Sequence, residues 1–105
     1  MIITVFRSRV NEANDRAYAR RAAELSDLAA AMPGHISHTT FVAPDGERCT
    51  VVEFEDEASH LAWAEHPIHR AAMDEATSGD APYYTEYDIK IGPVERSHSW
   101  SADKP

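Results

Sequence analysis

The chain has 105 residues, 43% of them hydrophobic and 27% charged, which indicates one globular domain. No apolar run approaches the roughly 20 residues that a membrane-spanning helix needs. A formal net charge of −8 argues against nucleic acid as a partner, because neutralising phosphates requires a surplus of clustered Lys and Arg. The single cysteine, Cys49, leaves no internal disulfide and fits a reducing compartment, so the expected location is the cytoplasm.

The first expected element is a strand over residues 2–10, a short run rich in β-branched and aromatic residues. Its apolar residues fall on both faces, so we expect both faces to be covered. A helix should follow, capped by Asn11 or Asn14 and carrying an apolar stripe as far as Met32. The Pro33-Gly34 pair predicts its end.

A hairpin is expected next, with strands over residues 35–42 and 48–54. The connecting Pro44-Asp45-Gly46-Glu47 is a typical turn sequence. His35 and His38 are three residues apart on the first of these strands, which predicts that they point to opposite faces. His38 is the one that we expect to line a pocket.

The second helical region should begin after Asp56, a capping residue, and extend to about residue 78. Pro67 predicts a kink or break, because proline lacks an amide hydrogen and disfavours helical geometry at the residue before it. Beyond the break, His69 begins an apolar stripe that continues through Ala72 and Met73. The His69 ring is therefore expected to point between helix and sheet.

The last strand is expected over residues 83–91, with alternation that puts Tyr83, Tyr87 and Ile89 on one face. The order strand, helix, hairpin, helix, strand, with right-handed crossovers, predicts an α+β, ferredoxin-like β-α-β-β-α-β fold. Such a fold has a four-stranded antiparallel sheet with two helices on one face. We assign residues 1–96 to this domain and residues 97–105 to a C-terminal tail.

A homodimer is the expected assembly. One sheet face should be bare of helices, and the apolar face of the last strand, with its tyrosines and isoleucines, is predicted to lie there. A second copy of the chain stacked on that face would cover it.

Residues 54–58 (FEDEA) and 61–72 (LAWAEHPIHRAA) resemble the antibiotic biosynthesis monooxygenase superfamily, above all in the motif Trp63-x-x-His66-Pro67-x-His69. The similarity covers roughly residues 1–96. It implies a dimeric α+β barrel with a pocket between sheet and helices in each subunit. Some members oxidise phenolic or quinol-like molecules with molecular oxygen and no cofactor, which requires a base and a dry apolar pocket.

The resemblance and the stripe at His69 select the candidate site. As catalytic residues we predict a histidine base and its neighbours on the broken helix, namely His69, Trp63 and His66. As substrate-binding residues we predict Arg7, His38, Tyr83 and Met73. Structural roles remain as alternatives for these residues: packing for the aromatic rings and His69, a cap for His66 and a salt bridge for Arg7.

No metal and no other cofactor is expected, because two histidines around a broken helix lack a third ligand and no dinucleotide-binding motif is present. Relatives that degrade heme carry a strand-one Asn and a heme-ligating His, where this chain has Arg7 and Met73. The sequence thus predicts a cofactor-independent monooxygenase that acts on a small aromatic substrate. The alternatives are a non-catalytic barrel that binds a hydrophobic ligand or heme, and a small isomerase or decyclase.

Overall fold

The structure, a computed structural model, describes residues 1–103. It confirms the expected order of elements, with a single 3₁₀ turn before the first helix and with the second helical region divided in two. The elements are β1 (Ile2–Val10), η1 (Glu12–Asn14), α1 (Asp15–Ala31), β2 (His35–Val42), β3 (Arg48–Phe54), α2 (Glu57–Ala64), α3 (Pro67–Thr77) and β4 (Tyr84–Pro93).

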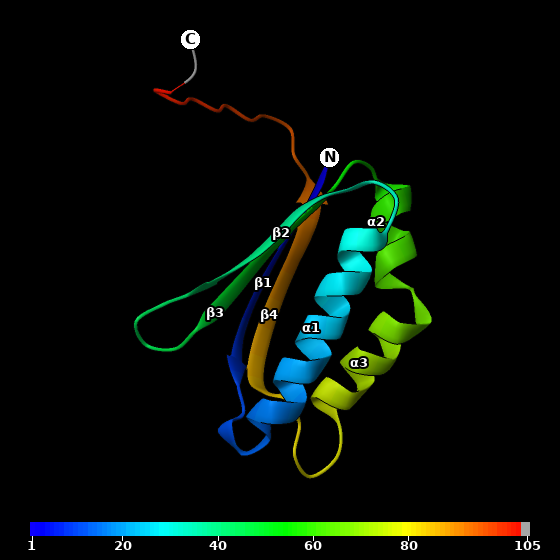
Figure 1. Cartoon of the computed structure of the whole chain (residues 1–105), viewed down its shortest axis with the longest axis vertical. Coiled ribbons are helices and arrows are strands. Elements are labelled where there is room, and N and C mark those ends of the chain that lie inside the picture. The colour runs from blue at the N-terminus through cyan, green and yellow to red at the C-terminus, as the bar shows by residue number, and fades with distance from the viewer. Residues whose placement is uncertain (104–105) are drawn as a thin grey trace.

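The four strands form one antiparallel sheet in the order β2-β3-β1-β4. All three helices lie on the same face of this sheet (Figure 1). This arrangement is the ferredoxin-like α+β fold that the sequence predicts. The two central strands, β1 and β3, carry the residues on which the helices pack.

The 3₁₀ turn η1 and the helices α2 and α3 begin where a capping side chain satisfies a free amide, whereas Asn14, the cap residue of α1, makes no such side-chain bond. Asn11 accepts from the amide of Ala13 at 3.1 Å, and Asp56 accepts from the amide of Ser59 at 2.8 Å. His66 caps α3 in the same way: its Nδ1 accepts from the amide of Ile68 at 3.1 Å. Because proline favours the first position of a helix, the chain breaks between α2 and α3 and the two segments change direction there.

Gly34 joins α1 to β2 in a crowded position. Its φ of +82° lies in the left-handed region that side chains with a Cβ avoid. A Cβ at this position would lie 2.5 Å from the Cβ of Ser59, which belongs to α2. The Gly34 carbonyl also accepts from the amide of Glu55 at 2.8 Å, so the end of α1 is fixed against the start of α2.

The fully buried core is small and contains Phe54, which is 0% exposed, and Val52 from β3, together with three alanines from the helices. The alanines are Ala29, Ala72 and Ala76. Small side chains let the helices approach the sheet at these points, but they do not fill all of the space between the layers. A cavity therefore remains beside the core.

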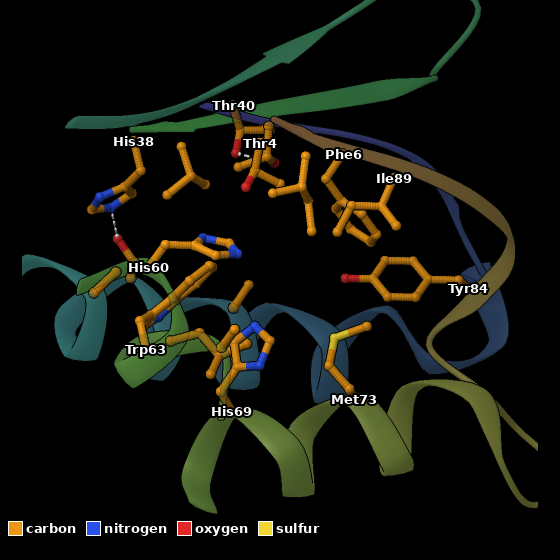
Figure 2. A pocket seen from close by; sticks show the side chains of 18 of the residues that line it. Thr4, Phe6, His38, Thr40, His60, Trp63, His69, Met73, Tyr84 and Ile89 are labelled. Atoms are coloured by element: carbon orange, nitrogen blue, oxygen red, sulfur yellow. Dashed lines mark hydrogen bonds between the residues drawn. The ribbon is translucent and has the colours of Figure 1, made fainter. Parts of the chain in front are cut away.

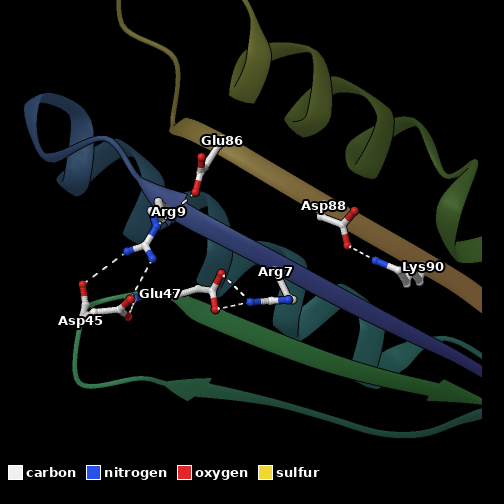
Figure 3. Close-up of polar contacts among 7 residues, drawn as sticks. All are labelled: Arg7, Arg9, Asp45, Glu47, Glu86, Asp88 and Lys90. Atoms are coloured by element: carbon white, nitrogen blue, oxygen red, sulfur yellow. Dashed lines mark hydrogen bonds and ion pairs between the residues drawn. The ribbon is translucent and has the colours of Figure 1, made fainter.

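The predicted orientation of the last strand is wrong. Ile89 and Ile91 pair with Phe6 and Thr4 of β1 and line the cavity on the helix side. The outer face instead carries charged residues, among them Arg7 (Figure 3). The physical reason is the register with β1, whose buried Thr4 decides which side of the neighbouring strand turns inward.

The outer face of the sheet holds a set of ion pairs (Figure 3). Arg7 bridges to Glu47 at 2.8 Å, and Arg9 bridges to Asp45 at 2.8 Å and to Glu86 at 3.1 Å. These pairs are exposed to solvent, so each contributes little to the stability of the fold.

Residues 94–103 follow β4 and extend away from the domain with no helix or strand (Figure 1). Residues 104 and 105 of the predicted tail lie outside the described residues. No helix in the part of the chain that the structure describes is long and apolar enough to cross a membrane.

Candidate active site

A cavity of about 220 Å³ lies between the helices and the sheet. Its wall is largely apolar, with side chains of α1 on one side and of β1 and β4 on the other (Figure 2). Polar groups stand at separate places around it, including Thr4, His38, His60, His69 and Tyr84. An apolar cavity with a few polar groups is the usual form of a small-molecule site.

Three rings gather where α2 meets α3. The Trp63 ring centroid lies 4.4 Å from that of His69 and 6.5 Å from that of His60. His60 and Trp63 are three residues apart on α2 and so share a face, whereas His69 enters from the first turn of α3. Behind them, Phe54 packs against Trp63 at 5.5 Å. The break at Pro67 thus lets two helices present rings to one space.

Several polar atoms of this cavity are buried without a hydrogen-bond partner among the described residues. They are Thr4 Oγ1, His60 Nδ1, Trp63 Nε1 and His69 Nδ1. Leaving such a group unpaired costs about 1–3 kcal/mol each. A ligand that carries its own donors and acceptors would recover part of that cost, so the cavity favours a molecule with polar groups over a pure hydrocarbon.

Burial lowers the pKa of His69 from its ordinary value, and the neighbouring His60 and His66 act in the same direction, while the backbone carbonyl of Ala64 opposes them. His69 is therefore neutral at physiological pH. A neutral imidazole has one nitrogen lone pair that can take a proton.

The lowered pKa of His69 has a consequence for stability. The unfolded chain takes up the proton at about pH 6.5, whereas the folded chain does so only at lower pH, so the free energy of unfolding should fall on acidification below about pH 6.5. Urea unfolding at about pH 7.5 and about pH 5.5 measures this fall. In His69→Gln the fall should be smaller, and an equal fall in both proteins would contradict the assignment. The remaining fall is expected from His38, whose pKa is also lowered, first by burial.

Tyr84 reaches the cavity because of an irregularity in β4. The register with β1 shifts between Arg9 and Val10, so Thr85 is an extra residue and Tyr84 turns to the same side as Tyr87 and Ile89. The Tyr84 hydroxyl points into the cavity (Figure 2). Burial raises its pKa, so the hydroxyl stays protonated and is available as a donor.

The prediction that His35 and His38 point to opposite faces is wrong. His35 pairs with Phe54 and His38 with Val52, so Ile36 is an extra residue in β2. This bulge brings both rings to the helix side, where His35 Nε2 lies 2.7 Å from His38 Nδ1. On its other side, His38 Nε2 lies 2.6 Å from Ser26 Oγ of α1.

The structure brings four of the predicted site residues to the cavity, namely Trp63, His69, Met73 and His38. It does not bring the other three. Arg7 points outward to Glu47, and His66 serves as the α3 cap. Tyr83 lies before β4 on the outer side of the helices, where its hydroxyl donates to Glu75 at 3.3 Å.

Sequence reasoning missed His60, Ser26 and Tyr84. His60 is detectable in principle, because its spacing of three from Trp63 puts both on one helix face, and it is 6% exposed. Ser26 is also detectable in principle, because it lies four residues after Ala22 and therefore on the face of α1 that carries the apolar stripe. The sequence gives no such signal for Tyr84, because in a regular strand its side chain would point away from the cavity. No group of three or more metal-binding side chains occurs within residues 1–103.

A sequence profile described as antibiotic biosynthesis monooxygenase matches residues 1–75. The chain belongs to the antibiotic biosynthesis monooxygenase family. No curated protein matches its sequence. The matched residues contain every cavity side chain discussed above except Tyr84 and the isoleucines of β4.

Several solved structures have the same fold as this chain. A Deinococcus radiodurans protein assigned to the antibiotic biosynthesis monooxygenases superposes with a TM-score of 0.80 at 9% identity, over 97% of this chain and 100% of that one. SnoaB, a cofactor-independent oxygenase from Streptomyces nogalater, gives 0.70 at 16% identity, over 91% and 94%. Rv0793 from Mycobacterium tuberculosis gives 0.72 at 13% identity, over 92% and 98%. At these identities the likeness concerns the fold alone.

Proposed function

We propose that this protein is a cofactor-independent monooxygenase acting on a small aromatic, phenolic or quinol-like substrate. The observation that carries the proposal is the neutral, half-buried His69 beside Trp63 in a mainly apolar cavity. Membership of the family and the likeness of fold to SnoaB support the same class of reaction.

The chemistry starts with removal of a proton. His69 accepts it from the substrate, and the electron-rich anion that remains reacts directly with molecular oxygen. One oxygen atom enters the product and the other leaves as water, so the substrate supplies all four electrons and no external reductant is needed. The apolar wall keeps water away from the anion before oxygen arrives.

Other cavity residues would hold the anion in place. The Trp63 indole offers a flat wall for an aromatic ring, and its N–H has no partner among the described residues. The Tyr84 hydroxyl, protonated because burial raises its pKa, offers a second donor. Donors of this kind, fixed in an apolar cavity, stabilise developing negative charge without having to reorient.

Oxygen uptake with a panel of anthrones, hydroquinones and catechols tests the proposal. We expect uptake by the purified, chelator-treated protein with at least one class, and incorporation of one atom of ¹⁸O₂ into the product. Protein that binds these compounds with no uptake above the blank would contradict it. That result would favour the second candidate, a non-catalytic barrel for a hydrophobic ligand, which the largely apolar cavity wall also supports.

A homodimer completes the proposal, with the outer face of the sheet as the contact. Besides its ion pairs, that face carries Val5 and Val51, which pair across β1 and β3, and Phe41, which is 59% exposed. A second copy stacked there would remove these apolar groups from water.

Light scattering of a dilute solution should give twice the subunit mass of 11.7 kDa. Val51→Glu should shift the population to single subunits, because the new charge lies in the contact. Leu61→Glu, on the exposed side of α2, should leave the dimer intact. A single-subunit mass for the unaltered protein would contradict the proposal.

A further inference from the structure

One group of side chains in the cavity has no role in the reaction outlined above. Ser26, His38 and His35 form a continuous chain of hydrogen bonds, with 2.6 Å between Ser26 Oγ and His38 Nε2 and 2.7 Å between His38 Nδ1 and His35 Nε2. Figure 2 shows His38 on the sheet side of the cavity, with its bond to the helix below. The chain thus connects α1 to β2 across the space between the layers.

The proton arrangement of this chain is constrained. Each of the two contacts needs one hydrogen, and a neutral histidine carries hydrogen on only one of its ring nitrogens. Either Ser26 donates to His38 and His38 donates to His35, or both bonds run in the opposite direction. Passing a proton along the chain converts one arrangement into the other, and both satisfy every contact.

The ends of the chain lie in different surroundings. Ser26 and His38 line the cavity, whereas His35 does not line it and is only half-buried. The His35 ring packs edge-on against Phe54 with 5.8 Å between centroids, which fixes the orientation of the outer ring. One end therefore faces the cavity and the other end lies toward solvent.

We propose that Ser26, His38 and His35 form a proton relay between a hydroxyl group of the bound molecule and solvent. The hydroxyl proton goes to Ser26 Oγ as the Ser26 proton moves to His38 Nε2. The Nδ1 proton of His38 moves to His35 Nε2, and the Nδ1 proton of His35 passes to water. One proton crosses, no electron moves and no covalent bond to Ser26 forms. The relay rests on the proposed function, because it requires an acidic hydroxyl in the cavity.

The relay is testable in the ligand-free protein by NMR of ¹⁵N-labelled histidines. The two rings should titrate as a pair, with one added proton shifting the nitrogen signals of both His35 and His38. In His35→Gln, the glutamine keeps a hydrogen bond to His38 but accepts no proton, so the joint titration should be lost. Thr39→Ala, on the exposed side of β2, should leave it unchanged. Independent titration of the two histidines in the unaltered protein would overturn the relay.

Turnover gives a second readout. With any substrate of the oxygen-uptake panel that is consumed, His35→Gln should lower kcat by about tenfold or more at constant KM and change the solvent isotope effect. An unchanged kcat and isotope effect would overturn the relay while leaving the oxygenase intact. If the unaltered protein consumes no substrate, the proposed function fails, and the NMR titration alone decides whether the chain shares a proton.

Discussion

Replacing His69 with alanine should lower the rate of oxygen uptake by about 10²- to 10⁴-fold, the range over which a positioned general base contributes. His69 is the half-buried, neutral histidine that lies against Trp63. Without it the substrate would keep its proton, and oxygen would not meet an electron-rich anion. Trp63→Phe should reduce turnover less, because a ring remains in place of the wall but the indole N–H is lost.

The control is His66→Asn, since asparagine is among the preferred helix caps and His66 serves as a cap outside the cavity. It should keep most of the activity. Melting temperatures of the same samples separate chemistry from packing: if His69 only fills space, His69→Ala should lower stability by about 1–4 kcal/mol and leave the folded fraction active. Loss of activity in His66→Asn but not in His69→Ala would reverse the assignment.

The largest effect on stability is expected for Gly34→Ala. The alanine would take on a left-handed conformation, at about 1–2 kcal/mol, and its Cβ would press on the Cβ of Ser59, at a further cost of about 1–3 kcal/mol. Urea unfolding should therefore show a loss of about 2–5 kcal/mol.

Gly46→Ala is the matched control for this experiment. Gly46 has a φ of +91°, but nothing lies within 4 Å of the position that its Cβ would take. Only the conformational cost, about 1–2 kcal/mol, should remain. Equal losses at the two glycines would show that contact with Ser59 does not restrict the chain at Gly34.

Residue composition, turn sequences and the periodicity of apolar residues predicted the four strands and both helical regions of this fold, but not the 3₁₀ turn η1. The break at Pro67 was equally predictable from the sequence, because its cause is the local covalent geometry of proline. The side chains of the cavity were predicted less completely than the helices and strands. His69 was found because helical spacing places it on an inward face, and Trp63 because its motif resembles that of the family.

The errors in the facing of strand residues have one physical origin. His35, Tyr84 and the orientation of β4 depend on strand register, which is set by contacts between segments far apart in the chain. A one-residue bulge reverses the side to which every earlier residue of a strand points, and no local pattern in the sequence records it. Alternation counted along an ideal strand therefore gave the wrong face for these residues.

The bulge at Ile36 makes the facing of His35 a matter of strand register and not of residue type. If β2 lost the bulge at unchanged length while His38 kept its place opposite Val52, His35 would turn to the outer face, with its chemical identity unchanged. Its bond to His38 would be lost in that single event. Deleting Ile36 would instead leave the two histidines two residues apart in a regular strand, so both rings would stay on the helix side. The connection between the inner histidine and its outer neighbour therefore depends on how the strand accommodates one extra residue.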